Sequence, residues 1–93
     1  MTPVIFRKDN DGEITAIFPT IPGTSDPTDF LVYAHIGKHG AATANWYFTT
    51  QRAYYSEYAP LLRELEQIGY VGLRIYERWQ PGFSVARQRA RRA

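Results

Sequence analysis

The stretch Glu57–Gly69, EYAPLLRELEQIG, is the part of the sequence that decides the fold. Its apolar side chains recur three and four residues apart, at Tyr58, Leu61, Leu62, Leu65 and Ile68. This spacing predicts an amphipathic helix with one apolar face. Ser56 suits the N-cap, and Gly69 stands where a left-handed C-cap is expected. Pro60 should lie in the first turn, because a later position would kink the helix.

Runs of β-forming residues precede this helix. Residues 4–8 and 13–18 are separated by Asp9–Gly12, whose residue types favour a hairpin turn. The second of these runs should stop at Pro19 and Pro22, because proline cannot donate to a strand ladder. The nearly continuous apolar run Asp29–Ile36 then predicts a central strand.

The rest of the chain gives weaker patterns. Gly37–Gly40 is expected to be a flexible loop, and residues 46–50 form either a further strand or an aromatic loop on the core. After the helix, residues 73–78 alternate apolar and polar side chains, as a half-buried strand does. Ser84 is placed to cap a short helix over Val85–Arg92.

These elements predict one α+β domain over residues 1–80. We expect a small antiparallel sheet of three to five strands packed on one amphipathic helix, in the order β-β-β-(β)-α-β. The sheet face away from the helix should be exposed, or covered by the aromatic segment Trp46–Tyr58. Residues 81–93 are expected to be an Arg-rich C-terminal extension, a basic tail on the domain.

Charge is distributed unevenly between these two parts. Residues 1–80 carry all nine acidic residues and seven of the eleven basic ones. The other four basic residues are arginines of the extension, which contains no acid. A basic arm of this kind favours binding to a polyanion, although a short arginine run is also a common solvated end.

Arginines and an aromatic ring also alternate along the last predicted strand. Arg74, Tyr76 and Arg78 should share one face, which suits contacts to phosphates and bases. Arg7 would join them if the first and last strands were neighbours, and an ordinary solvated strand face is the alternative. The residues predicted to bind nucleic acid are therefore Arg74, Tyr76, Arg78, Arg87, Arg89, Arg91 and Arg92.

Tyrosine and tryptophan are concentrated between residues 46 and 58. Tyr and Trp are frequent in the centres of protein interfaces, because they bury large areas at a low entropy cost. The residues predicted to bind a protein partner are Trp46, Tyr47, Tyr54 and Tyr55. Two alternatives stay open: the rings cover the sheet, or they join two copies of the chain in a homodimer.

Several kinds of chemistry have no support in the sequence. The absence of cysteine excludes disulfides and cysteine-based zinc sites. The two histidines, His35 and His39, are separated by a glycine that disfavours the helix needed to present both to one metal ion. The serines lie in no recognisable nucleophile motif. We therefore predict no enzyme activity, no catalytic residue, no metal site and no cofactor.

Targeting signals give an equally simple expectation. The N-terminus reaches charged residues after three apolar ones, too few for the apolar core of a signal peptide. No window approaches the roughly 20 apolar residues that a membrane-spanning helix needs. We expect a cytoplasmic protein without a membrane partner.

Three sets of segments carry a resemblance. They are Phe6–Lys8 with Asp11–Ile14 and Phe18–Pro19; His35–Ala42; and Glu57–Glu66 with Ile68–Tyr70. Together they resemble an uncharacterised family of short bacterial, plasmid and phage proteins. That resemblance implies a mobile-element or phage setting and supplies no activity. Residues 4–26, in which FPTIPG follows the hairpin, are also similar to the start of HicB-like antitoxins, whose N-terminal domain is a sheet with a helix.

These features favour a small non-catalytic binding protein encoded by a mobile element or phage. Its expected action is to bind and modulate or inhibit a host macromolecule, with a host protein or protein complex, for example a defence complex, as partner. One alternative is a regulator that binds nucleic acid through the strand face and the C-terminal tail. Another alternative is a HicB-like antitoxin.

Overall fold

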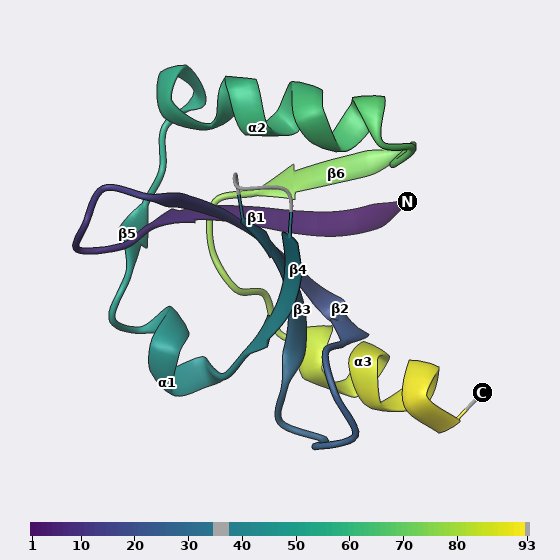
Figure 1. The fold of residues 1–93 in the computed structure, drawn as a ribbon. Helices are drawn as coiled ribbons and strands as arrows, with labels where there is room; N and C mark the ends of the chain where they lie inside the picture. The colour runs from purple at the N-terminus through teal and green to yellow at the C-terminus, as the bar shows by residue number, and fades with distance from the viewer. Residues whose placement is uncertain (35–37, 93) are drawn as a thin grey trace.

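A computed structural model describes residues 1–34 and 38–92 of the chain and shows one sheet between two helical layers (Figure 1). The strands are β1 (Thr2–Lys8), β2 (Ile14–Pro22), β3 (Phe30–Ala34), β4 (Lys38–Ala42), β5 (Gln51–Arg52) and β6 (Leu73–Tyr76). The helices are α1 (Ala44–Tyr47), α2 (Tyr55–Gln67) and α3 (Phe83–Arg92). The predicted α+β class is confirmed.

The sheet is antiparallel except at one edge. Its strands follow the order β4-β3-β2-β1, and β5 and β6 share the remaining edge of β1. β5 pairs with the end of β1 in antiparallel fashion, whereas β6 runs parallel to its first half, with Val4 opposite Ile75. The predicted antiparallel sheet is confirmed, and only the β1–β6 pair departs from it, because α2 carries the chain back along the sheet before β6 begins (Figure 1).

Alternate residues of the two central strands build a core on each face of the sheet. Val4 and Phe6 contact the α2 layer, while Ile5 between them faces the other layer. On the α2 side, Phe6 stacks on Tyr58 with ring centroids 4.3 Å apart. The opposite core contains Ile5, Ile17, Phe30, Tyr47 and Phe83, with Trp46, Tyr76 and Trp79 packed against it.

The predicted helix forms as α2, with a different start. The backbone carbonyl of Tyr54, and not Ser56, receives the first helical amides, and Glu57 accepts a hydrogen bond from the Tyr54 amide at 3.0 Å. Pro60 therefore lies inside the helix and not in its first turn. At the other end, Gly69 has a φ of +116°, and the Tyr70 amide donates to the carbonyl of Leu65 at 3.1 Å, as in a Schellman C-cap.

Two local expectations before α2 are corrected, and one open alternative is decided. β2 continues through Pro19 to Pro22, with a register irregularity after Phe18 that tolerates the prolines. Lys38–Gly40, expected in a flexible loop, belongs to β4, which pairs with β3; Gly37 lies outside the described residues. Residues 46–50 form no strand. α1 covers residues 44–47 and a hydrogen-bonded turn follows it, and Trp46 and Tyr47 pack on the core as the aromatic alternative expected.

The C-terminal residues form a docked helix, whereas the sequence suggested an extension. Phe83 is buried beside Tyr76 and Trp79, and Arg87 is only 4% exposed. Its Nη1 donates to the backbone carbonyl of Pro19 in β2 at 2.8 Å. The sheet face opposite α2 is therefore covered by α1 and α3, and neither exposed nor covered by the aromatic segment alone (Figure 1).

Candidate functional site

The four predicted protein-binding residues fall in two different environments. Tyr54 and Tyr55 are 57% and 65% exposed at the start of α2. Tyr47 is buried: its hydroxyl accepts a hydrogen bond from the Trp79 amide at 3.0 Å, and Arg7 lies over its ring. Trp46 is half-buried against the same core. Of the predicted set, only Tyr54 and Tyr55 are exposed.

Tyr55 lines a hollow that the sequence did not reveal. The hollow has a volume of about 110 Å³ and lies where β5 and β6 share the edge of β1. Tyr55 and Tyr58 of α2 line it together with Ile75 of β6 and Arg52 of β5. The Arg52 guanidinium lies 4.6 Å from the Tyr54 ring centroid and bonds the Glu77 carboxylate at 2.7 Å, which holds the exposed ring in place.

A second, wider hollow of about 450 Å³ continues along β6. Leu62 and Tyr70 line it, together with Val71, Leu73 and Ile75. Val71 is 84% exposed, and Ile75 lines both hollows. We define the α2–β6 surface as Tyr54, Tyr55, Val71, Leu73 and Ile75. In the described part of the chain β6 pairs only with β1, so its outer edge is not covered by another strand.

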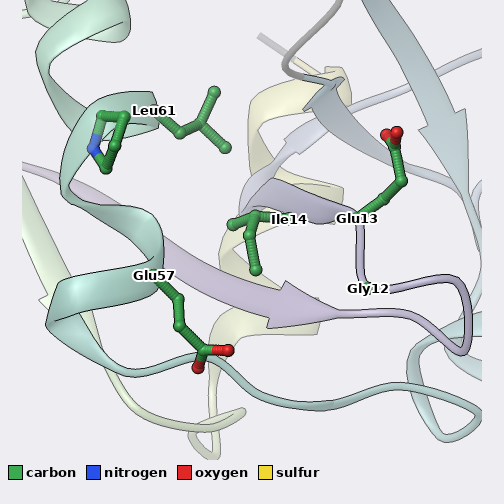
Figure 2. Close-up of a pocket in the computed structure, with 6 residues that line it drawn as sticks. Gly12, Glu13, Ile14, Glu57 and Leu61 are labelled. Atoms are coloured by element: carbon green, nitrogen blue, oxygen red, sulfur yellow. The ribbon is translucent and has the colours of Figure 1, made fainter.

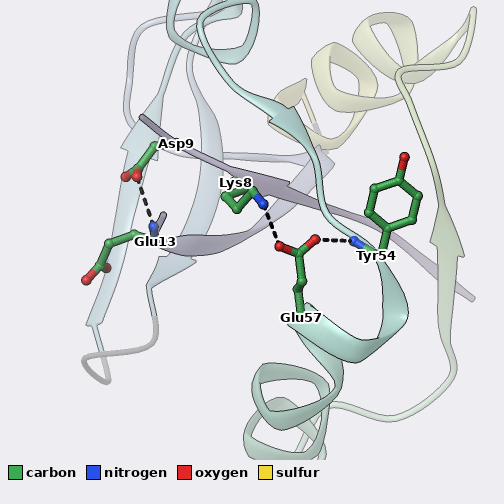
Figure 3. A network of polar contacts seen from close by, with 5 residues as sticks. All are labelled: Lys8, Asp9, Glu13, Tyr54 and Glu57. Atoms are coloured by element: carbon green, nitrogen blue, oxygen red, sulfur yellow. Dashed lines mark hydrogen bonds and ion pairs between the residues drawn. The ribbon is translucent and has the colours of Figure 1, made fainter. Parts of the chain in front are cut away.

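A pocket of about 210 Å³ lies between the β1–β2 turn and α2 (Figure 2). It contains two carboxylates, but Glu13 points away from Glu57. Glu57 accepts hydrogen bonds from Lys8 Nζ at 2.5 Å and from the Tyr54 amide at 3.0 Å (Figure 3). These bonds, first that of Lys8, lower the pKa of Glu57 below its ordinary value. An ionised carboxylate engaged in this way serves as a helix cap, whereas acid catalysis needs a raised pKa.

The residues predicted to bind nucleic acid are only partly brought together: the Arg74 guanidinium carbon lies 5.2 Å from the Tyr76 ring centroid. Arg74 and Arg78 are exposed, but Tyr76 is half-buried with its ring against Phe83 at 5.2 Å. Arg7 lies at the other end of β1, where it donates to Thr50. The Tyr76 ring is therefore contacted by both Arg74 and Phe83, and Arg7 does not join this group.

The arginines of residues 81–93 differ in burial and in hydrogen bonding. Arg87 is buried, and Arg91 donates to the backbone carbonyls of Thr24 and Ser25 at 2.9 and 2.5 Å. Arg89 is exposed on α3, and Arg92 ends that helix. Two of the four guanidinium groups thus fasten α3 to the β2–β3 part of the fold.

Of the two histidines, the structure describes His39. His35 lies outside the described residues, and His39 is in β4, where its Nε2 is 2.8 Å from the Tyr70 hydroxyl. Across residues 1–34 and 38–92, no group of three or more histidine and acidic side chains is arranged to hold a metal ion. Over the same ranges, none of the helices has the length and apolar character required to cross a bilayer.

Comparison of the chain with family models, curated proteins and solved structures found no match. The functional argument therefore rests on the geometry of the chain itself. Among the surfaces described above, the α2–β6 surface combines exposed tyrosines, apolar hollows and an uncovered strand edge. Sequence reasoning found its tyrosines, but it missed Val71 and Ile75, because their exposure depends on the position of β6 at the edge of the sheet.

Proposed function

We propose that this chain is a small non-catalytic binding protein that acts by occupying a macromolecular partner. The observation that supports it most is the α2–β6 surface, where Tyr54, Tyr55 and Ile75 are exposed around an uncovered strand edge. The partner is a host protein or protein complex met in the cytoplasm, and the mobile-element or phage setting implied by the family resemblance makes a host defence complex a candidate.

The proposed mode of contact is the addition of a strand. A partner segment in extended conformation bonds the free edge of β6 through its backbone, and its apolar side chains enter the two hollows on either side of Ile75. Tyr54 and Tyr55 then cover one end of the added strand. Because Tyr carries a large share of the energy in many interfaces, these two rings should dominate the affinity.

Alanine substitution tests this surface directly. The double variant Tyr54→Ala/Tyr55→Ala should weaken binding to the host partner about 30-fold or more, since losing a hot-spot residue costs about 2 kcal/mol. Ile75→Lys should weaken it independently, because a lysine on an edge strand opposes strand addition. Binding is measured by calorimetry with the partner first isolated on the immobilised chain, and circular dichroism checks the fold.

Val85→Ala is the matched control, because Val85 is 53% exposed but lies on α3, in the other helical layer. It should leave the affinity unchanged. Fluorescence anisotropy with labelled duplex DNA, single-stranded DNA and RNA at two salt concentrations tests the rival function. If the chain and its tyrosine variant both bind one of these nucleic acids with sub-micromolar, salt-sensitive affinity, the partner is nucleic acid and the proposal of a protein partner is wrong.

A further inference from the structure

Arg87 is a charged side chain in an unusual setting. It is 4% exposed, and its guanidinium carbon lies 5.8 Å from the ring centroid of Phe30 and 5.7 Å from that of Trp79. Nη1 donates to the Pro19 carbonyl, but the buried Nε has no hydrogen-bond partner among the described residues. A buried donor without an acceptor costs stability, and a charged one costs more.

The positive charge is only partly balanced within the chain. Burial lowers the pKa of Arg87, and the nearby Asp29 carboxylate opposes that effect. Asp29 itself accepts a hydrogen bond from the Thr24 hydroxyl at 2.7 Å. A negative group placed against the guanidinium from another side would therefore be favoured electrostatically.

Arg87 also lines a pocket of about 120 Å³. Four aromatic side chains from three segments surround it, together with two residues of α3; these six residues are Phe30, Tyr47, Phe48, Trp79, Ser84 and Arg87. Ser84 and Arg87 are three residues apart on α3 and so project from the same side of the helix. The amides of the first helical turn have no acceptor within the helix, and the helix dipole favours negative charge there.

We propose that this pocket binds a carboxylate attached to a small apolar group. The carboxylate lies against Arg87 and the start of α3, and the apolar group lies among the four rings. The pocket of about 120 Å³ is smaller than the roughly 150 Å³ cavity known to bind benzene, so the apolar group must be small and the carboxylate must lie at the pocket's mouth. The site is on the layer opposite the α2–β6 surface, so it does not depend on the proposed function (Figure 1).

Two sources supply this chemistry, a free carboxylic acid and the C-terminus of a peptide. The test titrates the full chain with benzoate and isobutyrate, with benzamide as the uncharged analogue and inorganic phosphate as a simple anion. Two short peptides ending in valine, one with a free carboxylate and one amidated, form the second arm. The readouts are the chemical shift of the Trp79 indole N–H and the thermal midpoint.

Saturable binding of benzoate or isobutyrate, at least tenfold tighter than benzamide and phosphate, is the expected result. Preference for the free-carboxylate peptide over both acids identifies a peptide end as the source, and the reverse order identifies a free acid. The proposal would be overturned if benzamide or phosphate bound as tightly as benzoate. It would also be overturned if the Trp79 signal did not shift at carboxylate concentrations up to about 50 mM, roughly the weakest useful affinity.

Variants separate the site from the fold. Arg87→Met should abolish benzoate binding, whereas Arg89→Met, an exposed arginine on the same helix, should leave it unchanged. Because Arg87 also bonds Pro19, its loss lowers the stability of the fold, which could by itself weaken binding. A second variant removes this ambiguity. Phe48 is 78% exposed, so Phe48→Ala should preserve the thermal midpoint and weaken benzoate at least threefold. Unchanged affinity in Phe48→Ala, or equal losses in the two arginine variants, would contradict the site.

Discussion

Glu57 joins the end of β1 to the start of α2 through one carboxylate. It bonds Lys8 at the end of β1, the Tyr54 amide at the start of α2, and lies in the first turn of that helix (Figure 3). Negative charge in a first turn also interacts favourably with the helix dipole. The start of α2 at Tyr55, earlier than Ser56 suggested, follows from this set of contacts.

The contacts of Glu57 give a pH-dependent prediction. Because its pKa is lower in the folded chain than the ordinary 4.5, its stabilising contribution is present above pH 4.5 and is lost as pH falls through the folded pKa. Glu57→Gln should therefore be less stable than the parent chain at pH 7, and the difference should shrink below pH 4.5. Urea unfolding at several pH values between 3 and 7 measures it, with exposed Glu66→Gln as the control. A gap that stays constant over this range would contradict the assignment.

At the scale of elements, α3 is the part whose role changed most. Its arginine-rich composition suggested a solvated arm, but the side of the helix that carries Phe83 and Arg87 is buried against β2. Arg91 adds contacts to the β2–β3 connection. The helix thus belongs to the folded core, and its removal is not a neutral way to test for nucleic-acid binding.

Deleting residues 81–93 should strongly destabilise the chain. Loss of a buried Phe alone costs about 3–5 kcal/mol, a large part of the 5–15 kcal/mol available to a typical domain. Guanidinium unfolding of the 1–80 chain should show a much lower midpoint or no cooperative transition. The double variant Arg89→Gln/Val85→Ala changes only exposed positions of α3 and should keep the parent midpoint. A 1–80 chain with the parent midpoint would show that α3 is dispensable.

The whole molecule has two cores that share one sheet. Neighbouring residues of β1, Ile5 and Phe6, belong to opposite cores, as do Ala16 and Ile17 of β2. Loss of either core therefore exposes apolar side chains of the same two strands. Strong coupling of this kind favours a single unfolding unit over two independent layers.

This coupling predicts coincident unfolding transitions. Both tryptophans, Trp46 in α1 and Trp79 before α3, pack against the core on that side of the sheet, so their fluorescence reports that layer. Far-UV circular dichroism reports all helices and strands. The two signals should give the same thermal midpoint. Phe83→Ala should lower both together, by an amount corresponding to about 3–5 kcal/mol. Earlier loss of the fluorescence signal would show that the α3 layer separates before the sheet unfolds.

Local signals in the sequence were sufficient for several elements. Periodicity, turn residues and a glycine predicted the hairpin over residues 4–18, the strand β3, the body of α2 and its end at Gly69. Each of these depends on residues close together in the chain, and the positive φ of Gly69 agrees with its predicted role. The exposure of Tyr54 and Tyr55 was foreseen as one of two alternatives.

Only the tertiary structure decided the contacts between distant residues. Arg87 is buried because a carbonyl 68 positions earlier accepts its hydrogen bond, and Tyr47 is buried because the Trp79 amide reaches its hydroxyl. The place of β6 beside β1 likewise exposes Ile75 and leaves the strand edge uncovered. The sequence by itself determined the hairpin, β3 and the body of α2, since local spacing and turn residues control them. The extent of β2, the formation of β4 and α1, and the faces that the elements bury depend on long-range packing, which local spacing does not encode.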